Sequence, residues 1–207
     1  MALPALTTTT SVLLDGLHDA GNGNVWQEFD SRYRPLILAY ARRLGLGEHE
    51  AADVAQETLL RFVRDYRDGK YERQRGRLRS WIIGIVKHCV LAAREQSARR
   101  RADGNIDTIE ALPDDAWLEA EWEAQRTQLL LRRALDELRR SSRTSDKTIQ
   151  AFERFVLHER SAADVASELG MTPQDVYMAK NRVAERLREI LMQLESVYDD
   201  AGERGTA

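Results

Sequence analysis

Apolar residues recur at steps of three and four along most of the chain, and this periodicity constrains the fold more than any other feature. Trp26, Phe29, Tyr33, Leu36 and Tyr40 follow it in one early stretch. The spacing places side chains on one face of an α-helix, whereas a half-buried strand needs alternation at steps of two. No strand-like alternation of useful length occurs. The sequence therefore predicts an all-α protein.

Breaks in the periodicity divide the helical stretches into two small domains. Gly21 and Gly23 interrupt the chain before the first of these stretches, and Gly104 and Pro113 mark a second, acidic break. The predicted organisation is a mostly disordered segment at 1–24 that can form a short helix near 12–17, a helical domain at 25–101, an acidic flexible linker at 102–118, a second helical domain at 119–198 and a disordered tail at 199–207.

Charge is distributed in blocks that the net charge of −3 conceals. Residues 61–101 hold thirteen basic and four acidic side chains, whereas residues 102–123 hold eight acidic side chains and none that is basic. A basic block of this density favours a polyanion as partner, and the acidic block would be repelled from the same polyanion. A solvated helix face followed by a linker explains the pattern equally well.

Several classes of protein are disfavoured by composition. A single cysteine, Cys89, excludes an internal disulfide framework and a cysteine-based zinc site, and the four histidines do not fall at metal-ligand spacing. No apolar run is long enough to span a membrane, and no Lys or Arg precedes Arg32 as a signal peptide would require. No nucleophile with its base and no phosphate-binding glycine loop is recognisable. We expect a cytoplasmic, non-enzymatic protein without metal or cofactor.

The most specific local pattern lies at residues 161–194. Ser161 and Asp164 form an acidic variant of a helix capping box, and Gly170 stands where a left-handed residue would end that helix. Thr172 then caps a new helix, with Pro173 at its first position. The pattern predicts a helix-turn-helix, although an αα-hairpin without a ligand has the same local signals.

The second helix of this motif has an outer face suited to the major groove of DNA. Amide side chains can read base edges there, and basic side chains can hold phosphates. The candidate contacts to DNA are Thr172, Gln174, Tyr177, Met178, Lys180, Asn181, Arg182 and Arg186.

Two further motifs resemble a known family. Asp53, Gln56 and Glu57 form a D-x-x-Q-E pattern within a predicted helix, and a basic loop and the run Leu78-Arg79-Ser80-Trp81-Ile82 follow. This order is similar to region two of the extracytoplasmic-function (ECF) sigma factors of bacterial RNA polymerase, in the sigma-70 family. The helix-turn-helix stands where that family has region four. The resemblance covers about residues 25–101 and 130–192.

The resemblance implies a docking face for core RNA polymerase, on the coiled coil of the largest subunit. Asp53, Gln56 and Glu57 share one polar stripe of their helix, opposite its apolar stripe. A solvated helix face is the ordinary explanation of such a stripe. The implied docking residues are Asp53, Gln56, Glu57, Leu60 and Arg61.

The resemblance also implies that the basic loop and the following helix capture the opened −10 strand of promoter DNA. Single strands are bound by cations together with aromatic stacking platforms. Family members commonly carry Asn where this chain has His88, and Trp81 lies at a position more typical of a core. The implied −10 residues are Tyr71, Arg73, Arg75, Arg77, Arg79, Trp81, Lys87, His88 and Arg94.

The family function that follows is an alternative sigma factor that reads −10 and −35 promoter elements. The family's V-K-S-R pattern in the recognition helix is absent, because the basic pair here is Lys180 and Arg182. An anti-sigma factor is a common partner in this family. A conventional helix-turn-helix regulator and a helical scaffold that binds only protein are the alternatives.

Overall fold

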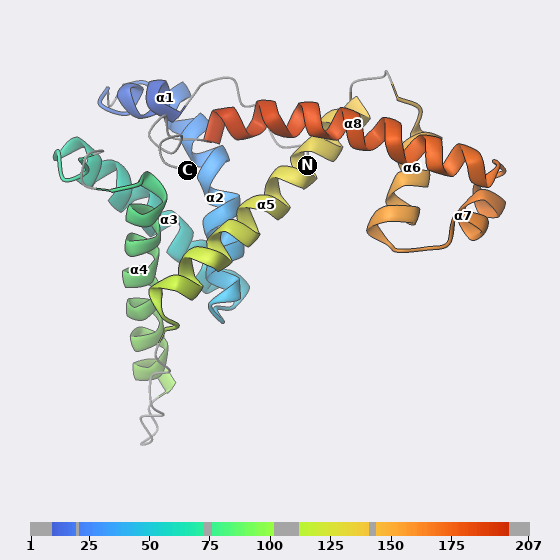
Figure 1. Cartoon of the computed structure of the whole chain (residues 1–207). Coiled ribbons are helices and arrows are strands. Elements are labelled where there is room, and N and C mark those ends of the chain that lie inside the picture. Colours follow the sequence, from blue (N-terminus) through green and yellow to red (C-terminus); the bar gives the residue numbers. More distant parts are fainter. Residues whose placement is uncertain (1–9, 20, 73–75, 102–111, 141–143, 199–207) are drawn as a thin grey trace. The chain divides into compact units, whose positions relative to one another are not determined.

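The computed structural model describes residues 10–19, 21–72, 76–101, 112–140 and 144–198. Over these ranges the regular elements are helices and no strand is present, which confirms the predicted all-α class (Figure 1). The elements are α1 (Thr10–Gly16), α2 (Gly23–Arg43), α3 (Glu48–Arg67), α4 (Leu78–Arg101), α5 (Asp115–Arg140), α6 (Asp146–Phe152), the π-helical turn η2 (Glu153–Leu157), α7 (Ala162–Leu169) and α8 (Pro173–Tyr198).

The chain divides into two compact units. Among the described residues, the N-terminal unit contains 10–129 together with Val197 and Tyr198, and the C-terminal unit contains 130–196. The boundary differs from the predicted start of a second domain at residue 119, because it falls inside α5. The predicted tail at 199–207 and most of the predicted linker, 102–111, lie outside the described residues.

The N-terminal unit is built on the apolar faces of α2, α3 and α4. The rings of Phe29 and Phe62 stack with centroids 4.8 Å apart, and Trp81 lies 5.0 Å from Phe62. Phe29 and Phe62 are almost completely buried. Burial of a side chain of this size stabilises a fold by roughly 1.5–3 kcal/mol. These aromatic contacts join one residue from each of the three helices.

Local signals fix where these helices begin and end. The backbone N–H of Gly47 donates to the Glu50 carboxylate at the start of α3, at 3.2 Å. Gly45, with φ +86°, occupies the left-handed region after α2, which suits glycine because it has no Cβ. Ser80 lies in the first turn of α4, which begins at Leu78. The Ser80 hydroxyl donates to Glu119 at 2.7 Å.

The segment before α2 is more ordered than predicted. The short helix expected near 12–17 is present as α1, and Leu13, Leu14 and Leu17 are buried. Arg67 Nε also donates to the Leu17 carbonyl at 2.6 Å. The helix expected in this stretch is therefore confirmed, and its three leucines supply the apolar area that docks it. Residues 1–9 and 20 lie outside the described residues.

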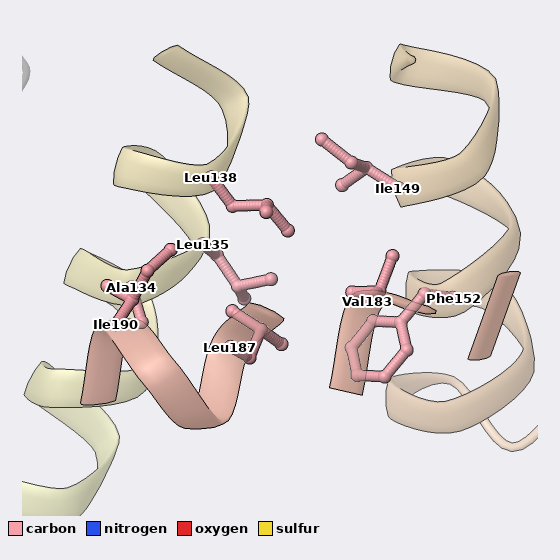
Figure 2. Close-up of a cluster of buried hydrophobic side chains, with 8 residues drawn as sticks. All are labelled: Ala134, Leu135, Leu138, Ile149, Phe152, Val183, Leu187 and Ile190. Atoms are coloured by element: carbon pink, nitrogen blue, oxygen red, sulfur yellow. The ribbon is translucent and has the colours of Figure 1, made fainter. Parts of the chain in front are cut away.

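The C-terminal unit has its own apolar core. Figure 2 shows Leu135 and Leu138 of α5 pointing toward Ile149 and Phe152 of α6, with Val183 and Leu187 of α8 completing the cluster. A second cluster lies where α7 and α8 meet. Its buried members are Ala151, Val165, Ala166, Val176 and Ala179. The small side chain of Ala166 suits this crossing.

Candidate functional site

The predicted docking stripe is an exposed face of α3. Asp53, Gln56 and Glu57 are exposed, whereas Val54, Ala55 and Leu59 on the opposite face are buried. Leu60 is 51% exposed on the same polar side. Arg61 is half-buried and lies 3.7 Å from Asp65. The stripe is therefore a polar helix face with one exposed leucine beside it.

A groove of about 510 Å³ runs between α3 and α4. Asp53, Glu57 and Arg61 line one wall, and His88 and Glu95 lie on the other. His88 therefore shares a groove with the acidic residues of the docking stripe. Cys89 lies buried at this groove, and its burial raises the pKa of the thiol.

The predicted −10 cations fall into different environments. Arg77 is exposed, whereas Arg79 and Lys87 pair with carboxylates of α5. Arg94 donates from its guanidinium to the Leu44 carbonyl at 2.6 Å, which gives it a part in holding α4 against the end of α2. Arg73 and Arg75 lie outside the described residues.

The two aromatic residues of the predicted −10 set, Tyr71 and Trp81, stack on one another. The rings of Tyr71 and Trp81 lie 4.8 Å apart at 18°, and the Trp81 ring also lies 5.0 Å from the ring of Phe62. Both side chains are half-buried. A pocket of about 210 Å³ beside Tyr71 is lined by Tyr66, Leu14 and the polar residues Ser11 and Asp15 of α1. The stack therefore rests on the core and has one edge near solvent.

The N-terminal half of α5 lies beside α2 and α4 in the N-terminal unit (Figure 1). Leu118 and Trp122 are buried, and the Trp122 ring makes an edge contact with Tyr40 at 5.4 Å. The Tyr40 hydroxyl donates to the Leu118 carbonyl at 3.1 Å. Burial, assisted by Glu119 and Glu121, raises the pKa of Tyr40. The sequence placed Trp122 in the second domain, whereas its ring lies against Tyr40 of α2.

Acidic side chains of this half-helix meet the basic helix α4. Glu123 and Glu119 lie 2.8 Å and 3.3 Å from the Arg79 guanidinium, and Asp115 lies 2.9 Å from the Lys87 ammonium. Glu121 points instead to Arg43 of α2, at 3.0 Å. Burial acts to raise the pKa of Glu121, but hydrogen bonds from Arg43 and Gln125 leave it below its ordinary value. Sequence reasoning missed these partners, although the adjoining basic and acidic blocks were the signal for them.

The helices α7 and α8 meet at the left-handed residue predicted from the sequence. Gly170 has φ +57° and ψ +54°, and the Ser161 hydroxyl oxygen accepts from the Asp164 N–H at 3.1 Å. The Thr172 and Asp175 pair is reciprocal, because each backbone N–H donates to the side chain of the other residue. The hydrogen bonds from Thr172 lower the pKa of Asp175. The predicted capping contacts are confirmed.

One face of α8 presents the residues that the sequence singled out for DNA. Val176, Ala179 and Val183 face the core, and the opposite face is exposed. Tyr177 makes an edge contact with Phe155 at 5.4 Å, and Lys180 Nζ lies 6.0 Å from the same ring. Arg186 is half-buried and pairs with Glu189. The exposed members of the set are Thr172, Gln174, Tyr177, Met178, Lys180, Asn181 and Arg182.

Comparison with known proteins identifies one part of the chain. Residues 29–100 match the family model of sigma-70 region 2, a span that holds most of α2, all of α3 and nearly all of α4. Among curated proteins, none matched the chain. In the part of the chain that the structure describes, no helix is long and apolar enough to cross a membrane, and no cluster of His, Cys, Asp or Glu suits a metal ion.

Proposed function

From the sigma-70 region 2 match, which supports a sigma-70 family sigma factor, we propose that this chain is an alternative sigma factor of the ECF type. It binds core RNA polymerase and directs initiation at promoters whose −10 and −35 elements it reads. The observation that carries the proposal is the agreement between the matched span and the exposed stripe on α3. The chain acts in the cytoplasm and performs no covalent chemistry of its own.

The α3 stripe supplies the contact to polymerase in this proposal. Gln56 and Glu57 give polar specificity, and Leu60 gives exposed apolar area whose burial in an interface is favourable. The adjoining groove adds depth to an otherwise convex helix. A helix of the largest polymerase subunit's coiled coil is the partner that the family resemblance implies for this face.

The loop after α3 and the start of α4 serve as the −10 reader. Unpaired bases need a stacking surface and their phosphates need cations. The stack of Tyr71 on Trp81 offers the first, and Arg77 beside it offers the second. Arg94 is the least favourable of the predicted −10 residues as a phosphate ligand, because its guanidinium is already bonded to the Leu44 carbonyl.

The α7–turn–α8 unit serves as the −35 reader. Its second helix carries amide and basic side chains on one exposed face, and a major groove about 12 Å wide admits such a helix. Gln174 and Asn181 can bond to base edges, and Lys180 and Arg182 can hold phosphates. The capping hydrogen bond between Thr172 and Asp175 holds the backbone of the first turn of α8, in which Gln174 lies.

The test is a pull-down of purified core RNA polymerase with the full chain and with its Gln56→Ala/Glu57→Lys variant. Wild-type protein should bind stoichiometrically, and the variant should lose about tenfold or more in affinity, as expected for polar residues at the centre of an interface. A Gln193→Ala/Glu195→Lys variant makes the same chemical change on exposed residues of α8 and serves as the control. Failure of wild-type protein to bind core, combined with salt-sensitive binding to duplex DNA by the chain alone, would favour a conventional regulator.

A further inference from the structure

We propose that the acidic face of the N-terminal half of α5 competes with nucleic acid for the cations of α4. The competing carboxylates belong to Asp115, Glu119 and Glu123, and the cations are Arg79 and Lys87. The inference rests on the proposed function, because it takes this face of α4 as a surface for the opened DNA strand. In the free chain that surface is occupied from within the same unit.

The contacts reproduce what a phosphate backbone would offer. Arg79 is held by two carboxylates at once, at 2.8 Å and 3.3 Å, and Lys87 by a third at 2.9 Å. Glu119 also accepts a hydrogen bond from the Ser80 hydroxyl at 2.7 Å. Guanidinium, ammonium and hydroxyl groups are the usual ligands of phosphate oxygens. Because the groups of Arg79, Lys87 and Ser80 that face α5 already bond to its carboxylates, a DNA strand must displace those carboxylates to use the same groups.

The carboxylates are placed so that they can yield without unfolding the unit. Asp115 is 87% exposed, and Glu119 and Glu123 are each 36% exposed, so water screens these pairs. The half-helix itself is held by the buried side chains of Leu118 and Trp122. Rotation of the acidic side chains is therefore enough to release the cations. The anchored helix keeps the competitor at a high effective concentration, which weak binding by a free anion would not match.

Glu121 provides a matched control within the same helix. It carries the same charge as Glu119 and Glu123, but its partner is Arg43 of α2. Replacing it by glutamine changes the net charge without releasing Arg79 or Lys87. A comparison of Glu119→Gln/Glu123→Gln with Glu121→Gln/Asp114→Asn, which removes two charges as well, separates local competition from the overall field.

The experiment measures binding of the full chain to a short fluorescein-labelled single-stranded DNA of mixed sequence, by anisotropy over a range of salt concentrations. We expect Glu119→Gln/Glu123→Gln to tighten binding by about threefold to tenfold at low salt, as for the loss of exposed ion pairs, and to steepen the salt dependence. Adding Arg79→Gln to that variant should remove the gain. Circular dichroism and thermal melting of each variant establish that it is folded.

Two results would overturn the inference: an equal gain in Glu121→Gln/Asp114→Asn, or no gain in Glu119→Gln/Glu123→Gln. A gain that is confined to Glu119→Gln/Glu123→Gln and is abolished by adding Arg79→Gln supports it. Binding of the same proteins to core RNA polymerase is measured in parallel. If the chain binds core normally but Glu119→Gln/Glu123→Gln does not bind DNA more tightly, the competition is rejected and the proposed function stands. If the wild-type chain does not bind core, the proposed function itself is rejected.

Discussion

Replacing Trp122 by alanine is expected to destabilise the N-terminal unit and to leave the C-terminal unit unchanged. The indole is 2% exposed and makes an edge contact with Tyr40 of α2. A tryptophan buries about 150–250 Å². At about 25 cal/mol per Å² this corresponds to roughly 4–6 kcal/mol, and measured truncations of buried aromatic residues cost about 3–5 kcal/mol.

The assay is native-state hydrogen exchange of the full chain, read separately in peptides from each unit. A loss of about 3–5 kcal/mol should accelerate exchange in α2 and α4 by about two to four orders of magnitude, since about 1.4 kcal/mol is tenfold. Peptides from α7 should exchange at the wild-type rate. Trp117→Ala is the matched control, because Trp117 lies on the same helix but is 38% exposed, and it should destabilise the unit clearly less than Trp122→Ala.

The opposite distribution of the effect would refute this reasoning. If Trp122→Ala accelerated exchange in α6 and α7 but not in α2, then Trp122 would belong to the C-terminal domain, as the sequence alone indicated. Equal effects of Trp117→Ala and Trp122→Ala would show that burial against Tyr40 contributes nothing. Either result would also weaken the competition proposed for the acidic half of α5, because Leu118 and Trp122 are its anchor.

Two further predictions concern the α7–α8 turn. Gly170→Ala should lower the stability of the C-terminal unit to thermal unfolding by about 1 kcal/mol, because φ +57° is unfavourable for a residue with a Cβ. An added Cβ would meet no atom within 4 Å, so the cost comes from the backbone conformation. Gly170→Asn should lose less stability, and equal losses would contradict the argument. Hydrogen bonds from Thr172 lower the pKa of Asp175 below 3.8, so its stabilising contribution is complete above that pH and is lost as the pH falls through the lowered value. Asp175→Asn should remove this acid-dependent step from melting curves of the C-terminal unit, and a step of unchanged size would assign it to other groups.

Sequence reasoning succeeded where the determinants are local. The caps at Ser161 and Thr172 and the left-handed Gly170 depend on residues within four positions of one another, so their chemistry is visible in the sequence. The exposed stripe at Asp53, Gln56 and Glu57 was equally predictable, because helical periodicity alone separates it from the buried face.

The failures concern partners that lie far apart in the sequence. α5 is one uninterrupted helix across the boundary between the two units, and its periodicity does not change where its packing partner changes. Nothing local to Trp122 indicates that Tyr40, rather than a residue of the second domain, covers it. Arg94 likewise carries the same charge whether it meets a phosphate or, as here, the carbonyl of Leu44.

The adjoining basic and acidic blocks are a sequence signal for the ion pairs between α4 and α5. The acidic block was interpreted as a linker that nucleic acid repels, and repulsion from DNA is a real consequence of its charge. The same charge also attracts the basic helix that precedes it, and Asp115, Glu119 and Glu123 lie within ion-pair distance of Arg79 and Lys87. Because the two blocks adjoin in sequence, their encounter costs little chain entropy. A basic block followed at once by an acidic block therefore predicts an internal ion-pair surface, and in the proposed competition its basic residues would bind DNA only when the acidic partners are displaced.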